Sequence, residues 1–96
     1  MSVDRLFVYG ILRGTVAGAE RAELPGYKKI YRGHATIKKD PLGVVEGEVF
    51  DVKSFGRYDL IEGVANNYYH RFKTTVYNVE REDYEEAWVY QQLDDK

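Results

Sequence analysis

The sequence predicts an α+β fold: a small mixed, mostly antiparallel β-barrel of about five to six strands with one or two short flanking helices. Three observations support this prediction. Apolar and polar residues alternate over several short stretches, as in strands that bury one face. Aromatic residues make up 15% of the chain, and nine of them are tyrosines, which suit strands. Most connecting segments are too short for a crossover helix, which favours antiparallel neighbours, and closure would remove exposed edge strands.

The first third of the chain predicts a strand, a helix and a second strand. Leu6–Tyr9 is a run of apolar and aromatic residues, typical of a buried strand. Thr15–Leu24 is rich in alanine and predicts a short helix, which the Pro25-Gly26 pair would end in a turn. Tyr27–Tyr31 alternates and predicts the next strand.

The middle of the chain predicts two more strands and a second helix. His34–Lys38 forms a short run that the Asp40-Pro41-Leu42-Gly43 turn would close. Val44–Val52 alternates well, but Glu46 and Glu48 share a face with Phe50, so the pattern leaves the buried side of this strand open. In Lys53–Ile61 the apolar residues recur at every third position, which is the spacing of one helix face. Two final strands are expected over Tyr68–Val79 and Glu86–Leu93, on either side of a charged turn.

Composition limits the classes of function. The 96 residues predict a single domain, residues 1–96. No cysteine is present, and no apolar run approaches the length of a membrane span. Met1–Arg5 does not resemble a signal peptide. We therefore expect a soluble, cytoplasmic protein without a membrane partner. The net charge of −2 argues against binding to nucleic acid, which is typical of basic proteins.

The loop after the first strand is one candidate binding site. It contains Tyr9, Gly10, Ile11 and Leu12, with a second glycine at Gly14. A glycine directly after a buried strand lets the backbone turn sharply, and the free N–H groups of such a loop bind an anion or a carbonyl oxygen. A plain turn from strand to helix explains the same residues.

Carboxylates are the other candidates, and Asp59 and Glu62 stand out by their placement. They lie three residues apart at the end of the expected helix. Apolar residues and a glycine flank Glu62. A carboxylate desolvated in such a setting becomes a competent general base near neutral pH. An exposed glutamate beside a helix stop is the alternative.

Other kinds of site receive less support from the sequence. His34 and His70 are isolated, with no third ligand at metal-binding spacing, so no metal site is expected. No glycine-rich phosphate loop or nucleophile elbow is present, so nucleophilic catalysis by the protein is not expected. The Lys28-Lys29 and Lys38-Lys39 pairs lie near tyrosines and resemble a nucleic-acid platform. A solvated strand face is favoured for them because the net charge is negative.

Several segments, taken in order, resemble the γ-glutamylcyclotransferase-like family over residues 6–90. The segments are Val8-Tyr9-Gly10-Ile11-Leu12-Arg13, Leu24-Pro25-Gly26-Tyr27, Val45-Glu46-Gly47-Glu48-Val49-Phe50, Phe55-x-x-Tyr58-Asp59-x-x-Glu62-Gly63, Tyr69-His70-Arg71 and Ala87-Trp88-Val89-Tyr90. The resemblance rests mainly on the glycine loop after the first strand and on the Asp-x-x-Glu-Gly segment. Ile11 stands where many relatives have Thr or Ser.

The resemblance implies a small barrel with flanking helices and an enzyme that releases 5-oxoproline from a small-molecule γ-glutamyl substrate without a cofactor. The α-amino group of the substrate attacks its own γ-carbonyl, and an amine or amino acid leaves. Glu62 matches the general acid/base of the family. Tyr9 to Leu12 match the substrate loop, whose backbone amides would hold the γ-glutamyl group.

Two other functions remain open at this point. One is a binding module on the same fold that holds a small metabolite without converting it, and the missing hydroxyl at Ile11 motivates it. The other is an interaction barrel that uses its tyrosine-rich strands.

Overall fold

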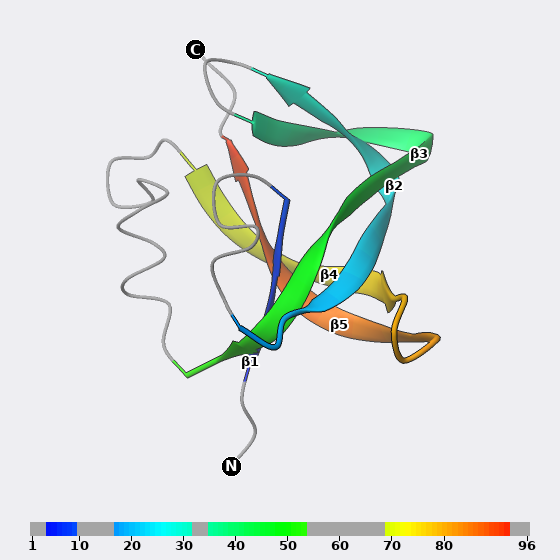
Figure 1. Ribbon diagram of the computed structural model, residues 1–96. Helices are drawn as coiled ribbons and strands as arrows, with labels where there is room; N and C mark the ends of the chain where they lie inside the picture. The colour runs from blue at the N-terminus through cyan, green and yellow to red at the C-terminus, as the bar shows by residue number, and fades with distance from the viewer. Residues whose placement is uncertain (1–3, 10–16, 32–34, 54–68, 93–96) are drawn as a thin grey trace.

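The protein is described by a computed structural model over residues 4–9, 17–31, 35–53 and 69–92 (Figure 1). These residues form five strands in chain order: β1 (Asp4–Val8), β2 (Glu20–Tyr31), β3 (Ala35–Val52), β4 (Tyr69–Asn78) and β5 (Asp83–Gln92). Four of them confirm strands expected at the same places. The expected Lys53–Ile61 helix lies outside the described residues from position 54 onward.

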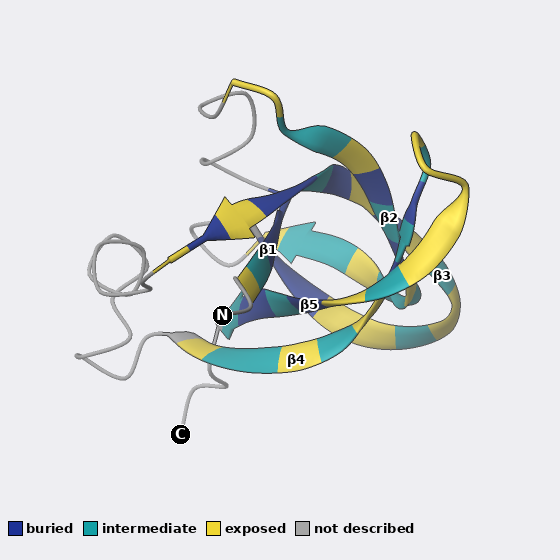
Figure 2. Cartoon of the chain, turned by 90° about the horizontal axis from the view of Figure 1, so that it is seen from below, coloured by how far each residue is buried: buried dark blue, intermediate teal, exposed yellow. Residues whose placement is uncertain are grey.

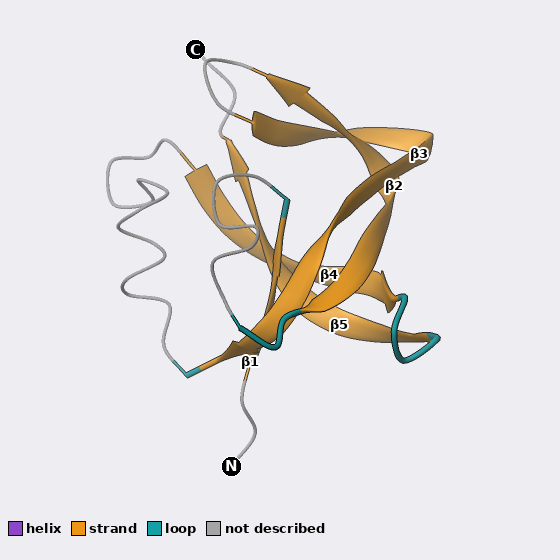
Figure 3. Ribbon diagram, viewed as in Figure 1, coloured by secondary structure: helices purple, strands orange, loops and turns teal. Residues whose placement is uncertain are grey.

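The five strands close into a barrel in the order β1-β3-β2-β4-β5. The sheet is mixed, because β1 pairs with β5 in parallel and with β3 in antiparallel fashion, while all the other ladders are antiparallel. Within the described ranges, the chain consists only of strands, loops and turns (Figure 3). That part of the chain accordingly holds no helix long and apolar enough to span a membrane.

The helix expected over Thr15–Leu24 is wrong for its second half, which belongs to β2. Gly18 adopts a positive φ of 82° in a turn, and β2 begins at Glu20. Ala22 and Leu24 then alternate into the barrel core, where both are at most 2% exposed. The packing of this alternating pair outweighs the weak helix preference of an Ala-rich stretch.

The turn expected at Asp40-Pro41-Leu42-Gly43 is also wrong, because one continuous strand, β3, includes these residues and the expected strands on both sides of them. Tyr27 pairs with Lys39, and Pro25 pairs with Val44. The segment Asp40–Gly43 between these pairs therefore lies opposite Gly26 alone and forms a bulge. Pro25-Gly26 likewise lies inside β2, with Gly26 at a positive φ of 85°. The turn residues bend the ladder without ending it.

Alternation gives the sheet two buried faces. Nine buried residues from the five strands, together with Tyr9, form the barrel core; among them are Phe7, Leu24, Val49, Val76 and Val89. A second cluster lies on the opposite face of β1, β3 and β5, and consists of Leu6, Val8, Phe50, Val52 and Tyr90. β4 instead alternates between exposed and partly buried residues over most of its length (Figure 2). The mixed pattern of Val44–Val52 therefore reflects a strand that buries both faces only near its end, at Val49, Phe50 and Val52.

Gly47 is required where β3 passes β1. A Cβ atom at this position would overlap the carbonyl oxygen of Val8 and lie 2.7 Å from the Phe7 ring. We expect Gly47→Ala to lower the free energy of unfolding by about 1–3 kcal/mol, as overpacking of a core does. Chemical denaturation measures the change. Val44→Ala, at an exposed position of the same strand, is the control and should cost less than about 0.5 kcal/mol. Equal effects would contradict the close approach.

Candidate active site

Tyr9, the first residue of the predicted binding loop, lies directly after β1 and is 5% exposed. Its hydroxyl donates a hydrogen bond of 2.6 Å to the carbonyl oxygen of Tyr90 on β5, and its ring stacks on Phe7 at 6.4 Å. These contacts fix the point at which the loop leaves the barrel. Because the hydroxyl proton is donated to a backbone carbonyl, the side chain anchors the loop rather than supplying a proton donor.

Aromatic side chains gather at this end of the barrel, which we call the aromatic end. Tyr27 of β2 and Phe72 of β4 pack against the barrel core, to which Tyr9 also belongs, and their ring centroids are 5.9 Å apart. The ring centroids of His70 and Phe72 are 5.6 Å apart. The aromatic end therefore combines side chains from β2 and β4 with Tyr9, which directly follows β1.

A short polar chain crosses the same end. His70 Nε2 lies 2.8 Å from Gln91 Oε1, and Gln91 Nε2 donates to the carbonyl oxygen of Ile37 at 3.1 Å. The donation to Ile37 fixes the amide of Gln91, so its oxygen faces His70 and His70 Nε2 carries the proton in this bond. His70 is an exposed strand histidine, as the sequence indicated. Among the described residues, no group of three His, Asp or Glu residues could hold a metal ion.

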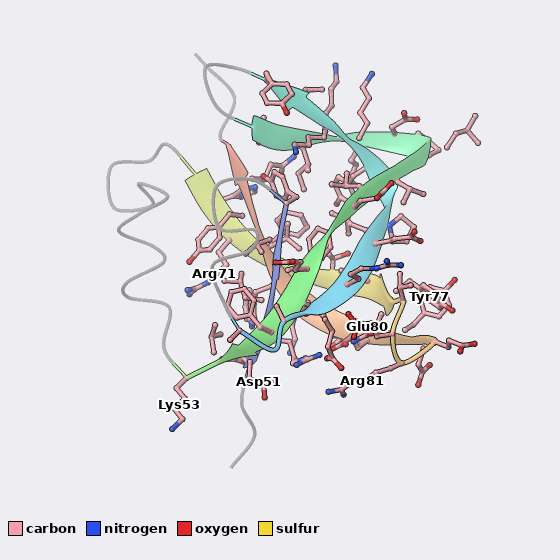
Figure 4. All side chains as sticks on the ribbon, in the orientation of Figure 1. Asp51, Lys53, Arg71, Tyr77, Glu80 and Arg81 are labelled. Atoms are coloured by element: carbon pink, nitrogen blue, oxygen red, sulfur yellow. The ribbon has the colours of Figure 1, made fainter. Side chains whose placement is uncertain are left out.

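The opposite end of the barrel, which we call the ionic end, carries one polar residue from each strand. They are Arg5, Glu20, Asp51, Asn78 and Glu85. Arg5 donates to Glu20 at 2.6 Å, to Asp51 at 2.8 Å and to Glu85 at 2.8 Å. Asn78, which is 1% exposed, donates to both Glu20 and Glu85. Figure 4 shows Asp51 at this end, together with Arg81, which donates to Glu20 at 2.8 Å.

Electrostatics makes the ionic end unsuitable for general base catalysis. The hydrogen bond from Arg5, followed by that from Arg81, lowers the pKa of Glu20 to about 2. Arg5 likewise lowers the pKa of Glu85. A carboxylate with such a depressed pKa is a weak base and gives up its ion pair when it takes a proton. The ionic end therefore joins the five strands, and the aromatic end is the better candidate for chemistry.

The ionic end should make stability depend on acid pH. Because the folded-state pKa of Glu20 lies below its unfolded value, its contribution is fully present above about pH 5 and is lost as pH falls toward about 2. The depressed pKa of Glu85 acts in the same direction. We expect the melting temperature to fall steadily over this window, as recorded by circular dichroism. A melting temperature that stays flat between about pH 5 and about pH 2.5 would show that these ion pairs add nothing.

The remaining predicted site residues lie outside the described part of the chain. These are Gly10, Ile11 and Leu12 of the loop, and Asp59 and Glu62. The described residues fix only the points at which these segments join the barrel. The loop follows Tyr9 at the aromatic end. The segment with Glu62 leaves β3 at the ionic end, after Asp51, and enters β4 at Tyr69, which pairs with Gln92 at the aromatic end.

Comparison with known proteins identifies the fold. The chain matches no family model and no curated protein. Solved structures do match. One is a γ-glutamyl cyclotransferase with a TM-score of 0.77 and 22% sequence identity, over 97% of this chain and 68% of that chain. The chain has the γ-glutamylcyclotransferase-like fold.

Other solved structures share this fold. A solution structure of a protein from Arabidopsis thaliana matches with a TM-score of 0.78 and 18% identity, over 98% of this chain and 71% of that chain. An uncharacterized protein from Homo sapiens matches with a TM-score of 0.78 and 20% identity, over 98% of this chain and 69% of that chain. The γ-glutamylcyclotransferase-like fold thus extends over nearly the whole chain, as the resemblance in sequence implied.

Proposed function

We propose that the protein is a γ-glutamylcyclotransferase-type enzyme that releases 5-oxoproline from a small γ-glutamyl amine or γ-glutamyl amino acid. The observation that carries the proposal is the structural likeness to a γ-glutamyl cyclotransferase over 97% of the chain. The position of Tyr9 supports it, because the candidate substrate loop starts at the end of β1 among aromatic side chains.

In the proposed reaction, the α-amino nitrogen of the substrate attacks its own γ-carbonyl carbon and forms the five-membered ring. Glu62 takes a proton from the attacking nitrogen and passes a proton to the nitrogen of the leaving amine as the amide C–N bond breaks. Backbone N–H groups of Gly10 to Leu12 stabilise the oxygen on which negative charge develops. Since the nucleophile is part of the substrate, the protein needs no serine or cysteine nucleophile.

The two described carboxylates with clearly shifted pKa values are unsuited to act as the general base, which supports the assignment of this role to Glu62. Glu20 and Glu85, the two whose pKa values are clearly shifted, are shifted downward and are bound to Arg5. They lie at the ionic end, away from Tyr9. The segment that holds Glu62 joins β3 at the ionic end and β4 at the aromatic end.

A panel of substrates tests the proposal. Purified full-length protein is incubated with γ-glutamyl amines and γ-glutamyl dipeptides, and 5-oxoproline and the released amine are measured by mass spectrometry. At least one compound should yield both products in equal amounts. If a folded sample, checked by circular dichroism, releases 5-oxoproline from none of them, the enzyme proposal is wrong.

The second candidate function is a binding module on the same fold, which Ile11 favours because it brings no hydroxyl to the loop. Such a module would hold a small carboxylate or amine metabolite without turnover. A γ-glutamyl compound that raises the melting temperature while no 5-oxoproline forms would support binding over catalysis.

A further inference from the structure

Positive charge is concentrated in one hairpin. Between Leu24 and Lys39 the sequence contains five basic residues and no acidic residue, although the chain has 14 basic and 16 acidic residues in all. This stretch therefore carries +5, and the rest of the chain carries −7. The described part of it forms the outer ends of β2 and β3, which lie near the ends of β1 and β5 in Figure 1.

Strand register divides the four described lysines between the two faces of this hairpin. Lys28 pairs directly with Lys38, so these two side chains share one face. Lys29 pairs with Ile37 and Lys39 with Tyr27, so these two lysines share the other face. Lys29 and Lys39 are therefore diagonal neighbours across the two strands, and residues so placed lie about 7–8 Å apart.

No described acidic residue forms an ion pair with the four lysines. In the part of the chain that the structure describes, the ion pairs involve Arg5, Lys73 and Arg81, and none involves these four lysines. Lys29 Nζ lies 5.8 Å from the ring centroid of Tyr31, a contact that leaves its charge intact.

The face with Lys29 and Lys39 is the one turned toward the aromatic end. Ile37, opposite Lys29, belongs to the barrel core, and its carbonyl oxygen accepts from Gln91. Tyr27, opposite Lys39, packs against Phe72. Lys29, which is half-buried, and Lys39, which is exposed, therefore stand at positions that border the aromatic end.

We infer that Lys29 and Lys39 form a recognition pair for anionic leaving groups and that the enzyme prefers γ-glutamyl substrates whose leaving amine is an acidic amino acid. This inference rests on the proposed function. The γ-glutamyl group itself carries one ammonium and one carboxylate, so its net charge is zero in every such substrate. Only the leaving group changes the net charge: a simple amine adds none, whereas glutamate adds two carboxylates.

Two matched double variants test the inference. The kcat/KM values for γ-glutamyl-glutamate and for γ-glutamyl-methylamide are measured, and their ratio is compared at low and high NaCl. For the wild-type protein, the ratio should exceed one and fall with added salt. The Lys29→Gln/Lys39→Gln variant should lower the ratio about tenfold, mainly through KM, as expected for two partly exposed charge contacts. Lys28→Gln/Lys38→Gln removes the same charge from the opposite face and should leave the ratio unchanged.

The measurements distinguish failure of this inference from failure of the proposed function. Turnover of both compounds with a ratio that neither double variant alters, or that both alter equally, overturns the inference and leaves the proposed function in place. Absence of 5-oxoproline from both compounds and from the full panel overturns the proposed function and the inference together. Melting curves of the two variants confirm that both are folded.

Discussion

Replacing Glu62 by glutamine should lower kcat/KM for 5-oxoproline release by about 10²–10⁴-fold, the usual contribution of a general acid/base. Glutamine has nearly the same shape but can neither accept the proton of the attacking amine nor return one to the leaving amine. The measurement is initial-rate kinetics with the best substrate of the panel, followed by mass spectrometry of 5-oxoproline.

A second carboxylate provides the control for this substitution. Glu46 is an exposed glutamate on β3 and pairs across the ladder with Glu23, so Glu46→Gln removes one charge without loss of an attractive cross-strand pair. It should retain wild-type kinetics. If Glu62→Gln keeps activity comparable to that of Glu46→Gln, Glu62 has no part in the proton transfer.

Most of the strands could be predicted from local pattern, and the errors have a common cause. The residues of β1, β4 and β5 alternate or form short apolar runs, and their places were expected to within a few residues. The wrong predictions concern an Ala-rich stretch and the Asp40–Gly43 segment, where local preference favours a helix or a turn. Pairing with β3 and β2 overrides both preferences, and pairing between distant strands is not encoded in a short window.

The ionic end was not predicted from the sequence, although its five residues share a simple sequence pattern. Each of them lies two residues from a core residue on its own strand, as Arg5 does from Phe7 and Glu85 does from Ala87. Their side chains therefore continue the inward face of the strands. The sequence does not show that five such positions meet at one end, because that depends on the register of every ladder.

The candidate site could be predicted only in part. Tyr9 was expected to be the last residue of a buried strand and part of the substrate loop; it is buried and directly follows β1, and its part in a substrate loop stays a prediction. Its hydrogen bond to the carbonyl of Tyr90 had no signal in the sequence, since the partners are 81 residues apart. The same holds for the contact of Tyr27 with Phe72, which brings β2 and β4 together at the aromatic end.

Replacing Arg5 by methionine should be the most destabilising of the substitutions considered. Methionine keeps the packing of the stem but leaves Glu20 and Glu85, whose side chains are 21% exposed, without their shared cation. We expect a loss of about 2–4 kcal/mol, between the values for exposed and for fully buried ion pairs. For a domain of this size, this corresponds to a fall in melting temperature of roughly 10–25 °C. Calorimetry or thermal denaturation at pH 7 measures it.

Two further variants separate the role of Arg5 from that of charge in general. Arg81→Met removes another arginine that contacts Glu20, but the Arg81 side chain is 60% exposed, so this loss should stay below about 1 kcal/mol. Adding Glu85→Gln to Arg5→Met should restore part of the stability, because the amide costs less to leave unpaired than the carboxylate. If Arg5→Met costs no more than Arg81→Met, the ionic end is an ordinary set of surface ion pairs. The ladder hydrogen bonds and the apolar core would then hold the five strands together without help from these charges.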